Sequence, residues 1–343
     1  MPRFDWPACA CCAYCIDAFL FMKHFDVFNG DADGICALHQ LRLAQPMEST
    51  LVTGAKRDVA LLQRVEAVAV AADSVTVLDV SLETNHAPLV ALLERGVDVE
   101  FFDHHYAGAV PVHALLAAHI DPAPDVCTSL IVDRHLCGKH RLWAIAGAFG
   151  DNLMAPAHAL AVQARLAERD EQQLRELGEA MNYNAYGDSE ADLIVPPAAL
   201  YRAVQPHADP FEFIAATSLV EQLADSRRRD MALAHQQRPA AELTCGSVYV
   251  LPDAAWSRRV RGAFANALAT AEPQRAHAVL SATQCGDFTV SVRAPVDLPY
   301  GADRLCRSFA TGGGRMAAGG INSLARERFD EFVQMFRHVF EAA

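Results

Sequence analysis

The chain has 343 residues, 52% of them hydrophobic and 21% charged, which is enough for two domains with sizeable cores. Its formal net charge of −13 excludes a protein that follows long duplex nucleic acid through a basic groove, because each contacted phosphate needs a nearby Lys or Arg. No apolar run reaches the roughly 18 residues of a transmembrane helix, so we expect a globular cytoplasmic protein without a membrane partner.

The ten cysteines are unevenly distributed, and the first fifteen residues hold four of them: Cys9, Cys11, Cys12 and Cys15. These four are too closely spaced for an obvious zinc knuckle, and the other six form no C-x-x-C pair. A reducing setting without a disulfide framework is therefore expected. Because Met22 opens a stretch that is typical of a natural start, residues 1–22 are predicted to be a non-native or disordered N-terminal extension.

From residue 23, short apolar runs alternate with helix-like stretches, which predicts βα units and a parallel sheet. The predicted strands cover residues 25–29, 50–54, 75–80 and 97–102. The predicted helices between and after them cover residues 35–43, 59–68, 87–95, 127–136, 142–149 and 164–181. These elements predict a first α/β domain over residues 23–195.

A polar, Arg-rich helix over residues 221–237 predicts a helical linker across residues 196–240. A second, smaller α/β domain is predicted over residues 241–343. Its predicted strands are 247–251, 276–282 and 288–292, its predicted helices are 260–270, 303–309 and 326–340, and residues 311–315 are predicted to form a loop.

Acidic and histidine side chains lie at or just after the carboxyl ends of three of the predicted strands. They are Asp31 and Asp33 after the first strand, Asp79 at the carboxyl end of the third, and Asp103, His104 and His105 after the fourth. Taken alone, the turn with Asp31 and Asp33 is more typical of an ordinary acidic turn than of a site, and Asp79 is more typical of a helix cap than of a ligand. Neighbouring strands lie about 5 Å apart, and open α/β sheets bind ligands at their carboxyl ends, so the side chains are expected to share one cavity. Divalent cations remove the repulsion between such carboxylates, and this donor mixture suits Mn²⁺ or Mg²⁺.

With these residues the chain resembles the DHH phosphoesterase superfamily, whose name matches the triplet Asp103, His104 and His105. The resemblance extends to Asp79, to the turn that contains Asp31 and Asp33, and to a later Asp151, in the family's order. The second half, with its SVR sequence at 291–293 and GGGR at 312–315, looks like the associated DHHA1 substrate domain. Together these features cover roughly residues 24 to 325.

The resemblance implies a site with two Mn²⁺ ions, or Mg²⁺ in their place. It implies that Asp31 binds one ion and Asp33 the other, that Asp79 bridges both, and that His104 and Asp151 complete the second site. His105 would contact the scissile phosphate or protonate the leaving oxygen, and Asp103 would orient its neighbours. Substrate-binding residues are expected to be Ser291, Arg293, Gly312, Gly313, Gly314 and Arg315.

Two positions depart from the family pattern. Many members carry a histidine ligand four residues before the first Asp of the turn, and that position is Val27 here, so Asn29 or water is expected to fill the gap. The family's usual GGGH reads GGGR, and Arg315 keeps a phosphate-binding role through its planar guanidinium. It cannot supply a titrating imidazole.

The expected activity is hydrolysis of a phosphoester in a short oligonucleotide or small nucleotide by metal-activated water. A phosphatase for small phosphate esters or pyrophosphate remains an alternative, since it would use the same metal arrangement. A different class is a degenerate, non-catalytic nucleotide-binding sensor, which the absent histidine would permit. The sequence leaves open whether the protein forms a homodimer.

Overall fold

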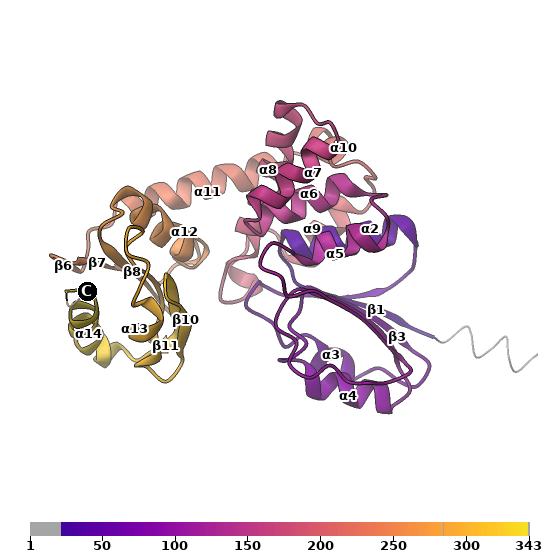
Figure 1. The fold of residues 1–343 in the computed structure, drawn as a ribbon, viewed down its shortest axis with the longest axis horizontal. Coiled ribbons are helices and arrows are strands. Elements are labelled where there is room, and N and C mark those ends of the chain that lie inside the picture. Colours follow the sequence, from indigo (N-terminus) through magenta and orange to yellow (C-terminus); the bar gives the residue numbers. More distant parts are fainter. Residues whose placement is uncertain (1–21, 284, 342–343) are drawn as a thin grey trace, which may run out of the picture. The chain divides into compact units, whose positions relative to one another are not determined.

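The computed structural model describes residues 22–283 and 285–341, so the predicted extension and its four cysteines lie outside the described residues except for Met22. The contacts divide the chain into two compact units (Figure 1). Of the described residues, the first comprises residues 22–54 together with Asp58–Ala167 and Tyr201–Ala208. The second comprises the three residues Ala55–Arg57, the stretch Glu168–Leu200, and everything from Asp209 onward. The predicted domain bounds stay a prediction.

The first unit contains a five-stranded, all-parallel sheet, which confirms the predicted α/β class. Its strands are β1 (His24–Phe28), β2 (Thr50–Val52), β3 (Ser74–Leu78), β4 (Asp98–Asp103) and β5 (Leu116–Ile120). Their order is β2-β1-β3-β4-β5, so the direction of winding reverses between β1 and β3. Ligands of doubly wound sheets bind beyond the carboxyl ends of the strands at such a switch point.

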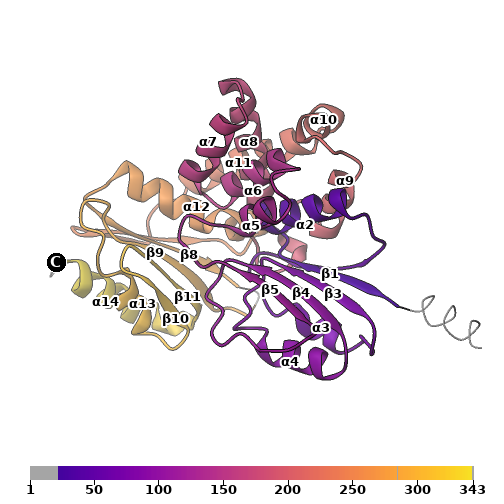
Figure 2. The ribbon, with the colours of Figure 1, turned by 45° about the vertical axis from the view of Figure 1, so that its right-hand side comes forward.

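Helices cover both faces of this sheet (Figures 1 and 2). One face carries α2 (Ala32–Ala44), α5 (Thr128–His135) and α6 (Arg141–Gly150), with α7 (Met154–Gln163) packed on α6, and the other carries α3 (Leu62–Glu66) and α4 (His86–Glu94). Phe25 and Val27 share an apolar cluster with residues of α3 and α4. Because Val27 is fully buried in that cluster, it belongs to the core and cannot face the polar end of the sheet.

The opposite face of β1 buries a carboxylate. Asp26 has no exposed surface, and it accepts hydrogen bonds from the guanidinium of Arg42 on α2 and from the hydroxyl of Ser49. His24 Nε2 lies 3.1 Å from the same carboxylate. Burial alone would raise the pKa of Asp26, but the hydrogen bonds with His24 and Arg42 outweigh it and lower that pKa. The network is a buried, fully partnered ion pair between β1 and α2.

The second unit begins with helices. They are α8 (Glu168–Ala185), the 3-10 turn η1 (Glu190–Asp192), α10 (Pro210–Ala216) and α11 (Leu219–His235), and α9 (Pro197–Val204) leads from the second unit back into the first. Among the described residues no helix combines the length and the apolar character needed to cross a membrane.

A mixed six-stranded sheet forms the rest of this unit, in the order β10-β11-β9-β8-β7-β6. Its elements are β6 (Ala241–Leu243), β7 (Gly246–Leu251), α12 (Ala255–Ala271), β8 (Ala276–Ala282), β9 (Phe288–Arg293), α13 (Ala302–Arg307), β10 (Gly312–Arg315), β11 (Ala318–Leu324), η2 (Arg326–Arg328) and α14 (Phe329–Glu341). Phe264 of α12 shares an apolar cluster with Val279 of β8. Leu280 of the same strand belongs to a separate cluster with residues of α13 and α14, so helices cover both faces.

The prediction of a loop at residues 311–315 is wrong. Gly312–Arg315 form β10, which pairs antiparallel with β11, a strand that the sequence pattern does not reveal. A run of glycines shows no side-chain alternation, so it is typical of a loop even where it is a strand. The physical reason for glycine here is close packing, since a Cβ at Gly312 would lie 1.8 Å from the carbonyl oxygen of Cys306 on α13.

Candidate metal centre

Asp33 lies in the first turn of α2, and the N-terminus of another helix holds its carboxylate. The backbone N–H groups of Thr128 and Ser129, which begin α5, each donate to one of its oxygens over 2.7 Å. The positive end of the helix dipole stabilises the ionised carboxylate, and each oxygen keeps a further lone pair for a cation. Nothing local in the sequence indicates this contact of Thr128 and Ser129 with Asp33.

His104 lies between two groups of ligand-type side chains. Its Nε2 is 3.4 Å from Asp79 Oδ1 and 3.8 Å from Asp151 Oδ2. Ligand atoms of Asp33, His104 and Asp151 all lie within 4.8 Å of one another, and so do those of Asp79, His104 and His105. The structure therefore brings together five of the predicted site residues, although their loops lie far apart in the sequence.

The positions of these residues follow from the sheet topology. Asp79 and His104 come directly after β3 and β4, and Asp33 lies in the first turn of the helix α2 that follows β1, the neighbour of β3 across the switch point. Asp151 ends α6, which packs against α2. Asp79 has a φ of 57°, in the left-handed region that a non-glycine residue adopts at some cost, and such strain gathers at functional sites.

Asp103 is fully buried and holds His105 in place. Its Oδ1 lies 2.7 Å from His105 Nδ1 and accepts the backbone N–H of His105 over 3.1 Å. Burial would lower the pKa of His105, but the hydrogen bond to Asp103 outweighs it and raises that pKa. The arrangement leaves Nε2 of His105 as the nitrogen that a cation or a phosphate can reach, and it supports an orienting role for Asp103.

Asp31 is placed differently. Its Oδ1 caps α2 by accepting the backbone N–H groups of Asp33 and Gly34 over 3.0 and 3.1 Å, and it belongs to neither group of ligand atoms. Its role as a ligand stays a prediction. Nearby, Asn29 carries a buried Oδ1 with no hydrogen-bond partner among the described residues. An amide oxygen of this kind fits the ligand position that Val27 leaves empty.

The donor set fits the metal that the resemblance implies. Carboxylate oxygens and imidazole nitrogens surround His104, and neither group contains a thiol. Cys36 and Cys127 lie close by, but burial, together with the charge of Asp33, raises the pKa of both thiols, which keeps them protonated and unsuited to binding soft metals. Oxygen ligands with one or two imidazoles suit Mn²⁺ or Mg²⁺.

Gly147 sets the spacing of this centre. A Cβ at Gly147 would lie 2.2 Å from Ser129 Oγ, and its carbonyl accepts the backbone N–H of Asp151 over 3.0 Å. We expect Gly147→Ala to lower the unfolding free energy by about 1–3 kcal/mol through overpacking. Because α5 must move away from Asp33, Mn²⁺ affinity should also fall by about tenfold. Urea unfolding and calorimetric Mn²⁺ titration would measure the two effects.

Gly262 provides a matched control for this substitution. It too lies inside a helix, α12, but a Cβ there would meet only the end of the Arg293 side chain at 4.0 Å. Gly262→Ala should leave Mn²⁺ affinity unchanged and stabilise the protein by up to about 1 kcal/mol through helix propensity. Similar Mn²⁺ affinities in the two variants would contradict the role given to Gly147.

The predicted substrate-binding residues lie in the second unit. Ser291 and Arg293 are on β9, where Ser291 is buried and Arg293 Nη1 donates to the carbonyl of Val292 over 2.9 Å. Arg315 is exposed at the end of β10, beside the three glycines Gly312, Gly313 and Gly314. The fold thus places these residues on strands of one sheet, and their contact with substrate stays a prediction.

A buried cation in the same unit was not predicted. Arg261 on α12 is 3% exposed, its Nη1 donates to the hydroxyl of Ser281, and its Nη2 is 3.8 Å from Asp188. Its Nε has no hydrogen-bond partner among the described residues. Burial, with the repulsion of Arg57, lowers the pKa of Arg261 to about 9. A buried guanidinium with an unused donor is typical of an anion site, but a single Arg in a helical pattern gives no such signal in the sequence.

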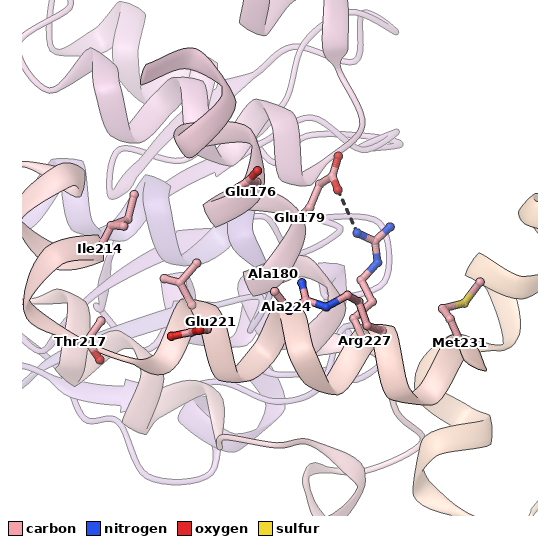
Figure 3. Close-up of a pocket in the computed structure, with 11 residues that line it drawn as sticks. Glu176, Glu179, Ala180, Ile214, Thr217, Glu221, Ala224, Arg227 and Met231 are labelled. Carbon is pink, nitrogen blue, oxygen red and sulfur yellow. Dashed lines mark hydrogen bonds and ion pairs between the residues drawn. The ribbon is translucent and has the colours of Figure 1, made fainter. Parts of the chain in front are cut away.

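A cavity of about 610 Å³ lies between α8, α10 and α11 of the second unit (Figure 3). Its rim carries Glu176, Glu221 and the pair of Glu179 with Arg227, whose atoms are 2.9 Å apart. The carboxylates would repel a phosphate, and both lining arginines are already paired, Arg227 with Glu179 and Arg228 with Asp225. Although it is well formed, this cavity is therefore a poor candidate for the chemistry that the strand ends support.

No protein-family model and no curated protein matches the sequence significantly. Solved structures do match the fold over almost the whole chain. The exonuclease RecJ bound to manganese aligns with a TM-score of 0.62 at 19% identity, over 96% of this chain and 93% of that one. A DHH domain from a member of a family of ribosomal proteins aligns with a TM-score of 0.59 at 13% identity, over 93% and 87%. The chain has the fold of DHH-family proteins.

A further match with the DHH fold is the pGpG-specific phosphodiesterase PggH of Vibrio cholerae, with a TM-score of 0.52 at 15% identity, over 94% of this chain and 99% of that one. The predicted resemblance and fold class are confirmed at the level of architecture: a parallel-sheet region, a helical stretch and a mixed C-terminal sheet. At these identities the matches establish the DHH fold and leave the reaction to be argued from the side chains.

Proposed function

We propose that this protein is a metal-dependent phosphoesterase that hydrolyses a phosphoester bond in a short oligonucleotide or a small nucleotide. The observation that carries the proposal is the convergence of Asp33, Asp79, His104 and Asp151 at the switch point of a DHH fold. The proposed cofactor is Mn²⁺, as two ions, with Mg²⁺ as the alternative. Support comes from the RecJ structure, which is bound to manganese.

In this proposal Asp33, His104 and Asp151 would bind one cation and Asp31 would bind the second. Asp79 would be a ligand of both cations. Bound divalent cations would neutralise charge on the phosphate and activate water for attack. His105 contacts the scissile phosphate or protonates the oxygen of the leaving group. Asp103 keeps the imidazole of His105 oriented through its hydrogen bond to Nδ1.

Short substrates are proposed for two reasons. The net charge of −13 offers little attraction for a long polyanion. One protein with the same fold is a phosphodiesterase specific for pGpG. Ser291, Arg293, the glycines of β10 and Arg315 are proposed to bind the part of the substrate that is not cleaved, and Arg261 is proposed to add a buried phosphate contact.

A hydrolysis panel tests the proposal. Protein stripped with EDTA and reloaded with Mn²⁺ would be given a linear dinucleotide, a pentanucleotide, a nucleoside 3′,5′-bisphosphate, pyrophosphate and p-nitrophenyl phosphate. We expect Mn²⁺-dependent cleavage of at least one of the first three at a higher kcat/KM than of the last two. The reverse order would favour the small-ester phosphatase. Binding of nucleotides without any turnover would identify a sensor.

Arg261 gives a prediction in which stability and affinity change in opposite directions. Arg261→Met removes a buried cation whose carboxylate partner Asp188 is 3.8 Å away, so the protein should be as stable as the wild type or more so. Since a charge-assisted hydrogen bond to the substrate is lost, KM for the preferred nucleotide should rise by roughly tenfold. Thermal unfolding and steady-state kinetics would measure the two effects.

Arg258 is the matched control, because it lies one turn earlier in α12 and is 8% exposed. Its guanidinium is fully engaged, with Nη2 2.8 Å from Asp192 and Nη1 paired with Asp253. Arg258→Met should therefore destabilise the protein by leaving Asp192 buried and unpaired. If Arg261→Met destabilised the protein in the same way, the guanidinium of Arg261 would have a structural role, and the proposal that it contacts phosphate would be wrong.

A further inference from the structure

Exposed apolar side chains gather at one edge of the second unit. Val296, Leu298 and Tyr300 are 56%, 48% and 48% exposed in the segment between β9 and α13, and Met316, in the turn between β10 and β11, is 57% exposed. Large apolar side chains grouped in this way on a protein surface mark a binding site more often than scattered ones do. We call these four residues the apolar edge.

Backbone hydrogen bonds join the two parts of the apolar edge. The N–H of Ala294 donates to the carbonyl of Ala317 over 2.9 Å, and the N–H of Ala302 donates to the carbonyl of Met316 over 3.0 Å. The segment that carries Tyr300 therefore begins and ends on the β10–β11 turn. Figures 1 and 2 both show α13, which follows this segment, beside β10 and β11. Tyr300 and Met316 thus lie on backbone segments that these hydrogen bonds hold side by side.

Three arginines border the apolar edge. Arg315 follows the glycines of β10 and directly precedes Met316, and Arg304 and Arg307 lie on successive turns of α13. All three are exposed, and Arg307 Nη2 reaches the carbonyl of Gly314 at 3.5 Å. The neighbouring acid Asp303 lies 3.6 Å from Arg307. Asp297, between Val296 and Leu298, is a second acid here and is exposed, so three arginines face two acids at this edge, although the chain as a whole carries a net charge of −13.

We propose that Tyr300 and Met316 form a stacking surface for a nucleobase, and that Arg304, Arg307 and Arg315 bind the phosphates attached to it. Exposed aromatic rings beside arginines are how proteins hold single-stranded nucleic acid without reading its sequence. The proposal rests on the proposed function and narrows its substrates to those that carry an unpaired base. It predicts that small phosphate esters without a base gain nothing from this edge.

The test uses two fluorescent probes in EDTA, so that binding is read without hydrolysis. One is a single-stranded pentanucleotide, and the other has the same backbone with abasic sites in place of its bases. Tyr300→Ala should weaken binding of the pentanucleotide about tenfold, the effect expected when one stacked base is lost, and should leave binding of the abasic probe unchanged. Tyr300→Phe, which keeps the ring, should bind both probes as the wild type does.

Val112→Ala is the matched control, because Val112 is a fully exposed apolar residue of the first unit and should affect neither probe. Equal losses on both probes in Tyr300→Ala, or no loss on either, would overturn the proposal. So would wild-type binding combined with loss of a dimer in sedimentation, since the edge would then join two copies of the chain. Because the readout is binding, these outcomes are distinct from a failure of the hydrolysis panel.

Discussion

Asp79→Asn should lower kcat/KM by on the order of a thousandfold while changing the thermal midpoint by no more than a few degrees. The carboxylate is 2% exposed, and its Oδ1 is 3.4 Å from His104 Nε2 and 3.3 Å from the hydroxyl of Thr128. An amide keeps this volume and can still accept the hydrogen bond. It loses the negative charge that a shared cation requires, and it relieves repulsion among the acids of the metal-free centre.

Asparagine is the informative substitution because of the backbone at this position. With φ at 57°, Asp79 occupies a region that Asn tolerates well. Ala would add about 1–2 kcal/mol of strain there, so a loss of stability could not be separated from a loss of catalysis. Asp121→Asn is the control, since Asp121 also follows a strand of this sheet but pairs with Arg134 at 2.8 Å, outside both ligand groups. Full activity in Asp79→Asn, with Mn²⁺ binding intact, would place the reaction elsewhere.

Arg42→Met should destabilise the protein by about 3–5 kcal/mol, because it leaves the carboxylate of Asp26 buried without its cation. Asp26 has no exposed surface, and its remaining partners would be Ser49 and His24. The double variant Asp26→Leu/Arg42→Met should recover most of the lost stability, since two apolar side chains leave no buried charge without a counter-ion. Urea unfolding of the wild type and both variants would measure the effect.

The pH dependence provides an independent check on this pair. In the wild type the pKa of Asp26 is lowered, so the pair stabilises the fold at neutral pH, and that stabilisation is lost as the pH falls through the lowered value. In Arg42→Met burial dominates and raises the pKa, so acid relieves the variant's defect. The difference in unfolding free energy between the two proteins should therefore shrink between pH 7 and about pH 4. A constant difference would mean that lost packing causes the defect.

Much of the fold could be predicted because its signals are local. The four predicted strands of the first sheet lie within two residues of β1 to β4, since each is a short apolar run that ends in polar residues. Four strands were not predicted: β5 of the first sheet and β6, β10 and β11 of the second. β10 consists of three glycines and Arg315, and β11 owes its place to pairing with β9 and β10, which no local pattern records.

The same difference between local signals and long-range contacts applies to the candidate metal centre. Asp33, Asp79 and His104 could be placed together because strand ends of a parallel sheet meet at one edge, and topology alone brings them there. What holds Asp33 could not be foreseen, because the N–H groups of Thr128 and Ser129 come from a helix about a hundred residues later. Similarly, the importance of Gly147 arises from the close approach of Ser129 on α5 to α6, which no local sequence pattern indicates.

The return of the chain to the first unit has a consequence for its synthesis. Asp151 is the last candidate metal ligand in the sequence, but later residues complete the unit that holds these ligands. Trp143 Nε1 donates to the carbonyl of Ala208 over 3.0 Å, and the ring of Tyr201 packs on Phe28. On the ribosome, the ligands would therefore emerge well before the segment that closes their scaffold, with the whole of α8 made in between. A fragment that stops at residue 195 would contain every proposed metal ligand but would leave exposed the surface of α2 and α6 that the later segment covers. An expression fragment of this unit should therefore extend beyond Ala208.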